Sequence, residues 1–247
     1  MSVETTSLAN KRILVTGGST GIGRATVALL AAAGARIVTF ARDEAALNVS
    51  LEHARAGSGG KISGVIADVA SKEGVTKVFA QVDAQLGGLD ILINNAGLAI
   101  EPAQESDDEA WRYGIETNFL GYLACAREAI PRLEAAGGGH IVFIGSISAE
   151  KRGKGSSVYA ATKAAVETYS KTLRKEVQEK NIKVTLIEPG SVGADMQEKS
   201  EAEQRLATEK HEMLFAEELA DTIQFALTRS ARTDISVMRV EPRLQKA

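Results

Sequence analysis

The sequence predicts an α/β protein in which a doubly wound, parallel seven-stranded sheet carries helices on both faces, all in a single domain of residues 1–247. Two observations support this fold class. Short runs of β-branched and other apolar residues alternate along the chain with longer segments of helical periodicity. The short runs are nearly continuous in apolar residues, which is typical of strands that are buried on both faces.

Seven apolar runs are expected to form the strands, and they are Arg12–Thr16, Arg36–Phe40, Ile62–Ala67, Leu89–Ile93, His140–Ile144, Lys183–Ile187 and Ile235–Val240. The helices expected between them are Ile22–Ala33, Glu44–Arg55, Lys72–Leu86, Glu116–Ala135, Val158–Glu179 and Ala216–Thr228. Asp43 and Ser71 precede two of these helices as N-caps, and Gly34 follows the first as its C-terminal stop. This alternation predicts right-handed crossovers between parallel strands.

One long segment without a strand, residues 191–215, follows the sixth expected strand. Ligands of doubly wound sheets bind at the carboxyl ends of the strands, so this insertion is expected to cover a substrate. Its few apolar residues are Met196, Leu206, Met213, Leu214 and Phe215, among Glu, Lys and Gln. Two interpretations stay open: a lid that closes on a small polar substrate, or a solvated helix pair that packs these residues together.

Composition excludes several classes of function. A formal net charge of −3 argues against a nucleic-acid or anionic-membrane partner, because both require a basic surface. With 3 His and 1 Cys, a Cys/His zinc site is not available, and no metal is expected. The single cysteine, Cys125, lies in an apolar helical run and is expected to be buried and unreactive. Because the chain has neither a long apolar span nor a signal-peptide pattern, a cytoplasmic location is expected.

A glycine-rich turn, Thr16 to Gly23, connects the first expected strand to the first helix. Glycines allow the backbone to turn tightly and approach a phosphate, which the helix N-terminus attracts. A P-loop is excluded, because Arg24 and Ala25 stand where Lys and Ser/Thr are required. The dinucleotide fingerprint is incomplete, because Thr26 replaces its third Gly or Ala. The turn therefore favours a nucleotide binder over a plain strand–helix connection.

The end of the second strand indicates which dinucleotide is bound. NAD-binding chains usually place a carboxylate there for the ribose 2′-hydroxyl, whereas an arginine accommodates the 2′-phosphate of NADP. Here Ala41 removes the carboxylate and Arg42 supplies a planar, permanent cation. Asp43 is an alternative ribose ligand, but capping of the next helix explains it better. The sequence therefore favours NADP(H) as cofactor.

Tyr159 and Lys163 are four positions apart in an expected helix, so both side chains project from one face. A free tyrosine has a pKa near 10, too high for a base at neutral pH. A nearby ammonium would favour the phenolate, and a depression of two to three units needs roughly 3–4 kcal/mol. Taken alone, however, the spacing is better explained by an exposed tyrosine beside a surface lysine.

Several motifs follow one another in register along nearly the whole chain: the turn Thr16–Gly23, Asp68–Val69, Asn94–Gly97, Asn118, Ser146, Tyr159 with Lys163, and Pro189–Gly190. Each motif is weak alone, but their order and spacing together are specific. With them the chain resembles the short-chain dehydrogenase/reductase family. The resemblance implies a Rossmann-like fold and an oxidoreductase that transfers a hydride between a nicotinamide and a carbonyl or alcohol.

The resemblance also implies a role for each matching residue. Tyr159 would be the general acid/base, and Lys163 would bind the nicotinamide ribose and lower the tyrosine pKa. Ser146 would hold the reacting oxygen, and Asn118 would hold a water that connects Lys163 to solvent. Cofactor contacts are implied for Gly17, Ser19, Thr20, Gly21, Ile22, Gly23, Arg42, Asp68, Val69, Asn95, Ala96, Gly97, Tyr159, Lys163, Pro189, Gly190 and Val192.

The sequence departs from the family pattern at two places. Ala194 stands where relatives carry a threonine that holds the nicotinamide carboxamide, so Ser191 or the backbone of Val192 would have to replace it. The last expected strand ends in the sequence Arg239 to Arg243, which lacks the Asp-Gly-Gly tail of many tetrameric relatives. It is more similar to the branch with NADP-dependent hydroxy-acid dehydrogenases and clavulanate-type aldehyde reductases. A homodimer or homotetramer is expected.

The expected substrate is a small hydroxy acid, aldehyde or ketone. Lys151, Arg152 and Lys154 follow Ser146 and would attract a substrate carboxylate or phosphate, although loop cations are more often simply solvated. The alternative function is a non-catalytic NADP-binding sensor or interaction protein on the same fold. Such proteins typically lose the tyrosine or the lysine, and this chain has both.

Overall fold

The computed structural model describes residues 5–58, 61–193 and 200–245. Within these residues the chain forms one seven-stranded sheet with the order β3-β2-β1-β4-β5-β6-β7, and every neighbouring pair is parallel. The strands are β1 (Arg12–Thr16), β2 (Arg36–Ala41), β3 (Ile62–Ile66), β4 (Ile91–Asn94), β5 (Gly139–Ile144), β6 (Ile182–Pro189) and β7 (Val237–Val240). The predicted fold class, a Rossmann-like doubly wound sheet, is confirmed.

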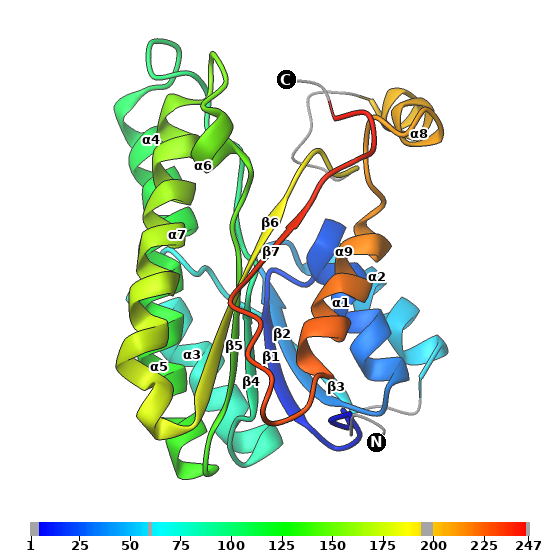
Figure 1. Ribbon diagram of the computed structural model, residues 1–247, viewed down its shortest axis with the longest axis vertical. Coiled ribbons are helices and arrows are strands. Elements are labelled where there is room, and N and C mark those ends of the chain that lie inside the picture. Colours follow the sequence, from blue (N-terminus) through cyan, green and yellow to red (C-terminus); the bar gives the residue numbers. More distant parts are fainter. Residues whose placement is uncertain (1–4, 59–60, 194–199, 246–247) are drawn as a thin grey trace.

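Helices cover both faces of the sheet (Figure 1). One layer contains α1 (Gly21–Ala32), α2 (Glu44–Ala56) and α9 (Ala216–Leu227). The other contains α3 (Lys72–Leu86), α4 (Asp108–Ile115), α5 (Gly121–Ala135) and α7 (Ser157–Val177). The remaining elements are a π-helix, η1 (Glu116–Leu120), a 3-10 turn, η2 (Gln178–Lys180), and the short helices α6 (Ser148–Lys151) and α8 (Glu201–Glu209).

The two layers explain why the strands are apolar on both faces. In β1, Leu14 packs into the core cluster below α3, α5 and α7, whereas Ile13 and Val15 pack into the cluster below α1, α2 and α9. All three side chains are fully buried. Successive strand residues point to opposite faces, so a strand between two helical layers needs apolar residues at every position.

The predicted helix boundaries are confirmed where capping determines them. Asp43 accepts a hydrogen bond from the N–H of Ala46 at 2.9 Å, and Ser71 accepts one from Gly74 at 2.9 Å. Gly34 follows α1 with φ of 83°, a left-handed conformation that favours glycine. These local signals need only a few neighbouring residues, which is why the sequence reveals them.

The prediction that a helix begins at Glu116 was wrong. The helical segment begins at Asp108, with Asp107 as its N-cap, so α4 lies in a stretch where no helix was expected. Gly114 is the buried residue of α4, and Trp111 and Ile115 are partly buried on the same face. With only 8 residues, this amphipathic segment is shorter than the window over which helical periodicity is recognised. The first 5 residues of the predicted helix, Glu116–Leu120, form the π-helix η1, which the sequence did not indicate.

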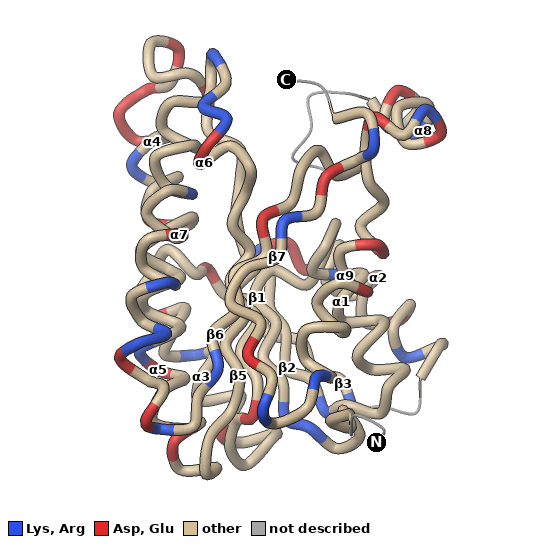
Figure 2. The backbone as a smooth tube through the Cα atoms, in the orientation of Figure 1, with Lys and Arg blue, Asp and Glu red and all other residues tan. Residues whose placement is uncertain are grey.

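The chain order creates a crevice in the sheet. From β1 the chain moves outward to β2 and β3 and then crosses to β4 on the other side of β1. The loops that follow β1 and β4 therefore leave in opposite directions, and ligands of such sheets bind at this switch point. Figure 2 shows charged residues mainly along the outer helices and at the strand ends. In the described ranges, no helix has both the length and the apolar character to span a membrane.

Candidate active site

A cavity of about 610 Å³ opens at the carboxyl ends of the strands, at the switch point. It brings together every predicted site residue of the described chain except Gly23 and Asn118, which stand just behind its lining. The lining residues that were not predicted are Phe40, Ala41, Asp43, Ala67, Leu98, Thr117, Ile144 and Gly145. Residues up to 175 positions apart in sequence thus share one cavity (from Gly17 to Val192).

The ends of β1 and β4 are held together by side-chain hydrogen bonds. Thr16 Oγ1 accepts from the N–H groups of Asn95 and Ala96, each at 2.8 Å. Asn95 Nδ2 donates to the carbonyl oxygens of Thr16 at 3.0 Å and Gly17 at 3.1 Å. Asn95 was expected to border the cofactor ribose, and it does line the cavity. Its amide also braces the glycine-rich turn.

The glycine-rich turn fits a dinucleotide phosphate. Gly17 and Gly21 have φ angles of 68° and 50°, which a side chain would strain. A Cβ on Gly17 would also lie 2.8 Å from the Cα of Ala96. Helix α1 begins at Gly21, and the side chain of Thr20 does not cap it. The N–H groups of its first turn are therefore available to an anion.

Two residues that the sequence did not reveal lie where the adenosine part of a dinucleotide would bind. Tyr113 connects two predicted residues: Arg42 Nη1 donates to its Oη at 2.5 Å, and its Oη donates to Asp68 Oδ2 at 2.7 Å. Thr117 lines the cavity and is buried, and its Oγ1 has no hydrogen-bond partner among the described residues. A buried hydroxyl without a partner is costly, so a ligand in the cavity would satisfy it. No sequence motif marks either residue.

Ser146, Tyr159 and Lys163 meet at the far end of the cavity. Helix α7 carries Tyr159 and Lys163, and Ser146 follows β5. Tyr159 and Ser146 share a side-chain hydrogen bond, and Ser146 Oγ also accepts from the N–H of Ser148 at 3.1 Å. Lys163 Nζ lies 5.8 Å from the centre of the Tyr159 ring and donates to the carbonyl oxygen of Ile144 at 3.0 Å.

Burial dominates the electrostatics of this group. Lys163 is only 3% exposed, and the loss of solvation lowers its pKa to about 8. Burial raises the pKa of Tyr159, and the hydrogen bond from Ser146 opposes this rise without reversing it. The expected depression of the Tyr159 pKa is therefore wrong for the described protein. The spacing of Tyr159 and Lys163 predicted their proximity, but it contained no information on how little water reaches them.

Asn118 lies in the π-helix η1 and is completely buried. Its Oδ1 accepts from the N–H of Leu98 at 2.9 Å, and its Nδ2 donates to the Leu98 carbonyl at 2.8 Å. Asn118 therefore anchors the loop after β4. Gly97 in that loop separates Asn118 from Lys163: a Cβ there would lie 3.3 Å from Asn118 Oδ1 and 3.8 Å from Lys163 Nζ. The water-holding role of Asn118 stays a prediction.

The loop after β6 forms the nicotinamide end of the predicted site. Pro189, Gly190 and Val192 line the cavity. Ser191 is held by the C-terminal segment, because its N–H donates to Gln245 Oε1 at 2.8 Å and its Oγ accepts from Gln245 Nε2 at 3.0 Å. Ala194, the predicted weak point of the site, lies outside the described residues.

The described part of the insertion 191–215 is anchored at its end. Met213 and Leu214 are buried, and Leu214 pairs with Val192 in a parallel bridge. Leu206 and Phe215 are about half exposed, while Met196 lies outside the described residues. The buried residues fix where the segment returns to the core. Both interpretations of its function stay predictions.

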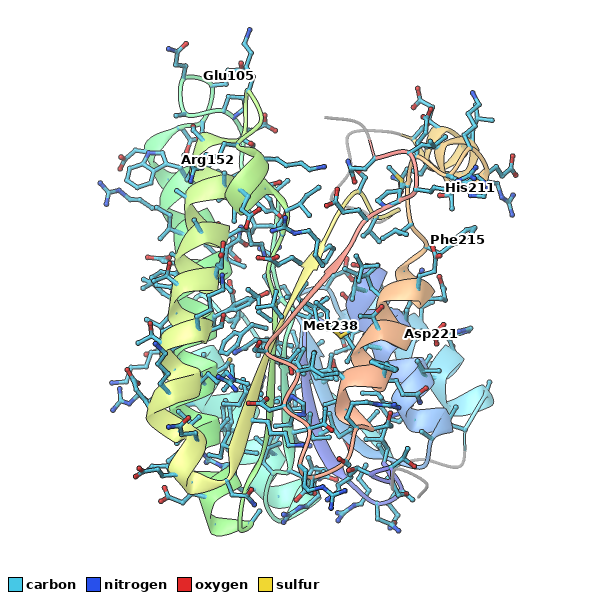
Figure 3. All side chains as sticks on the ribbon, viewed as in Figure 1. Glu105, Arg152, His211, Phe215, Asp221 and Met238 are labelled. Atoms are coloured by element: carbon cyan, nitrogen blue, oxygen red, sulfur yellow. The ribbon has the colours of Figure 1, made fainter. Side chains whose placement is uncertain are left out.

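The cations that follow Ser146 differ in their surroundings. Lys151 Nζ forms an ion pair with Glu241 at 2.7 Å, so its charge is balanced by a carboxylate of the protein. Arg152 and Lys154 are exposed. Figure 3 shows Arg152 at the α4–α7 side of the molecule and Phe215 on the other side.

The two other predictions about reactive groups concern cysteine and metal ions. Cys125 is completely buried, as predicted, and burial raises the pKa of its thiol to about 12. Across the described part of the chain, no group of three or more His, Cys, Asp or Glu residues is arranged to hold a metal ion.

Comparison with known proteins gives one consistent result. The profile of the short chain dehydrogenase family matches residues 11–205. An uncharacterized oxidoreductase of Staphylococcus saprophyticus is 31% identical over 236 residues, which are 95% of this chain and 98% of the relative. Another from Staphylococcus aureus is 33% identical over 240 residues, 96% of this chain and 99% of the relative.

Solved structures agree with these sequence matches. The L-sorbose reductase of Gluconobacter frateurii, complexed with NADPH and L-sorbose, superposes with a TM-score of 0.87 at 30% identity and covers 98% of this chain and 100% of its own. A short chain dehydrogenase of Burkholderia cenocepacia in complex with NADP gives a TM-score of 0.85 at 26% identity, covering 96% of this chain and 98% of its own.

Proposed function

The chain belongs to the short-chain dehydrogenase family and is an oxidoreductase, and from this we propose that it uses NADP(H) to reduce a small carbonyl compound to the alcohol, reversibly. The observation that carries the proposal is the meeting of Ser146, Tyr159 and Lys163 at one end of a cavity whose other end has dinucleotide-binding features. When bound, the reduced nicotinamide supplies a hydride.

Three features of the cavity support NADP(H) as the cofactor. The glycine-rich turn and the uncapped N-terminus of α1 suit the pyrophosphate. Arg42 lines the cavity directly after Ala41, so a cation is available there for a 2′-phosphate. Asp43 also lines the cavity, but its Oδ1 accepts from the N–H of Ala46 as the N-cap of α2. That bond weakens the competing interpretation of Asp43 as an NAD ribose ligand.

In the reducing direction, Tyr159 donates its phenol proton to the carbonyl oxygen while the carbonyl carbon accepts the hydride. The raised pKa of Tyr159 keeps the phenol protonated at neutral pH, which is the form that reduction requires. Ser146 donates a hydrogen bond to the same oxygen and stabilises its developing charge. Lys163, with a pKa of about 8, is mainly protonated at neutral pH and can return a proton towards Tyr159.

The proposed substrate is a small carbonyl compound or the corresponding alcohol. A hydroxy acid, short aldehyde or ketone fits a site whose polar groups are a phenol and a hydroxyl, and a ketone gains support from the L-sorbose reductase neighbour. Residues 191–215 would cover this substrate.

The test is oxidation of NADPH with a panel of aldehydes, ketones including L-sorbose, keto acids and semialdehydes. Tyr159→Phe should lower turnover of any active substrate by roughly 10²- to 10⁴-fold while NADPH still raises the melting temperature. Turnover that is unchanged in this variant would remove Tyr159 from the chemistry. Equal melting shifts with NADH and NADPH would contradict the choice of cofactor.

The second candidate is a non-catalytic NADP-binding sensor or interaction protein. It retains all the cofactor features but needs neither Tyr159 nor Lys163. The hydrogen bond between Tyr159 and Ser146 favours the enzyme, because a sensor has no use for a hydroxyl pair at the nicotinamide end. Tight NADPH binding with no turnover across the whole panel would favour the sensor.

We propose that the protein assembles as a homodimer or homotetramer. An apolar groove on the outside of α7 and η1 supports this, and Leu120 beside it is 49% exposed. The groove is lined by Phe119, Ala164, Ala165, Thr168, Tyr169 and Thr172. Light scattering during gel filtration should give twice or four times the monomer mass. A monomer at all concentrations would contradict the assembly.

The proposed location is the cytoplasm. The single cysteine, Cys125, is free and buried, so the described fold does not depend on an oxidising compartment. Cell fractionation should recover the protein with cytoplasmic markers, and recovery with membranes or outside the cell would contradict this.

A further inference from the structure

Three side chains from distant parts of the chain form one hydrogen-bonded row beside the adenosine end of the cavity. Arg42 follows β2 and Asp68 follows β3. Tyr113 lies in α4, which belongs to the helical layer of α3, α5 and α7. Arg42 Nη1 donates to Tyr113 Oη at 2.5 Å, and Tyr113 Oη donates to Asp68 Oδ2 at 2.7 Å. The guanidinium carbon also lies 5.3 Å from the centre of the Tyr113 ring.

The chemistry of the three groups gives the row a single direction. A guanidinium only donates and a carboxylate only accepts, whereas a phenol does both. Tyr113 is therefore able to connect Arg42 to Asp68, and phenylalanine in its place would leave the two ends unconnected. Asp68 is itself fixed, because its Oδ1 accepts from the N–H of Ala70 at 2.9 Å. The side chain of Asp68, held by the loop after β3, therefore restrains Tyr113, and Tyr113 restrains the Arg42 guanidinium.

The hydrogen bond to Tyr113 restrains the Arg42 side chain but uses only one of its N–H donors within the described structure. A guanidinium has five N–H donors in one plane, and within the described structure Tyr113 takes one of them. The remaining donors can form a bidentate pair with a phosphate. A long arginine side chain loses much rotational freedom when it binds a ligand, so a contact that restrains it beforehand increases affinity.

We propose that Tyr113 is a positioning residue that holds the Arg42 guanidinium against the cavity and thereby sets the preference for a cofactor with a 2′-phosphate on its adenosine ribose. The inference rests on the proposed use of NADP(H). It deepens that function by naming a specificity determinant on α4, a helix that contributes none of the predicted cofactor contacts.

The test measures dissociation constants by calorimetry for NADPH, NADH and adenosine 2′,5′-bisphosphate. Tyr113→Phe should weaken the binding of NADPH and of the bisphosphate about five- to tenfold, and that of NADH less than twofold. In the Arg42→Ala background, Tyr113→Phe should have no further effect on NADPH, because Tyr113 acts through Arg42. Thr76→Ala removes an exposed hydroxyl of α3, a helix with no residue in the cavity lining, and should leave all three constants unchanged.

The outcomes separate this inference from the proposed function. If the wild type binds NADH as tightly as NADPH, the choice of NADP is wrong and the role of Tyr113 fails with it. If the wild type prefers NADPH but Arg42→Ala leaves the ratio of NADPH to NADH affinity unchanged, NADP stands and the roles of Arg42 and Tyr113 are overturned. If Arg42→Ala lowers the ratio but Tyr113→Phe weakens both cofactors equally, or neither, NADP stands and the positioning role is overturned. Additive effects in the double variant also overturn it. Thermal unfolding of each variant without cofactor identifies loss of fold as a separate cause.

Discussion

Lys163 should make the folded protein more stable as the pH rises from 7 to 10. Burial lowers its pKa from 10.5 to about 8, whereas in the unfolded chain its pKa returns to the ordinary value. At a pH between about 8 and 10.5, Lys163 is mostly deprotonated in the folded state and mostly protonated in the unfolded state. Because the unfolded state binds more protons there, raising the pH favours folding.

The size of the effect follows from the two pKa values. The two pKa values differ by about 2.5, and each unit corresponds to about 1.4 kcal/mol, so the buried ammonium destabilises the fold by about 3 to 4 kcal/mol at low pH. Most of this, about 2 to 3 kcal/mol, should be recovered by pH 10. Tyr159 titrates in the opposite sense, because its raised pKa lowers stability once the pH exceeds 10. The measurement should therefore stop at pH 10.

The assay compares the wild type with Lys163→Met in urea unfolding at pH 7, 8, 9 and 10 without cofactor. Taking the difference cancels groups that titrate alike in both proteins. Relative to the variant, the wild type should gain about 2 to 3 kcal/mol across the series. Lys175→Met, at an exposed position of α7, should show a constant difference. A constant difference for Lys163→Met as well would refute the reasoning, since it would mean that Lys163 keeps its proton in the fold.

Three further predictions concern the rest of the chain. Gly23→Val should abolish the NADPH-induced rise in melting temperature and lower stability by about 1–3 kcal/mol, because a Cβ there would lie 2.0 Å from the carbonyl oxygen of Gly17. Asp90→Asn, which breaks the 2.7 Å pair with Arg12 at the opposite end of the sheet, should lower the free energy of unfolding by about 1–3 kcal/mol in a denaturant titration and leave turnover unchanged. Cys125 should react with a thiol reagent at pH 8 only after urea unfolds the protein, and reaction in the native state would contradict its burial.

Much of the fold could be predicted because local patterns report burial. The apolar run around Leu14 is continuous because the strand lies between two helical layers, and the caps at Asp43 and Ser71 need only adjacent residues. Helix α4 could not be predicted in this way. It has only 8 residues and packs against α7, so its apolar face is too short to distinguish it from a loop in the sequence alone.

For Tyr159 and Lys163 too, the sequence determined one part of the site and the tertiary structure determined another. The sequence by itself determined that Tyr159 and Lys163 share a helix face, since the spacing of residues in a helix is a local property. The tertiary structure decided that Lys163 loses its solvation and that the pKa of Tyr159 rises, because desolvation sums over every element packed around the site. It also decided that Tyr113 connects Arg42 to Asp68, a contact between three segments that no local pattern specifies.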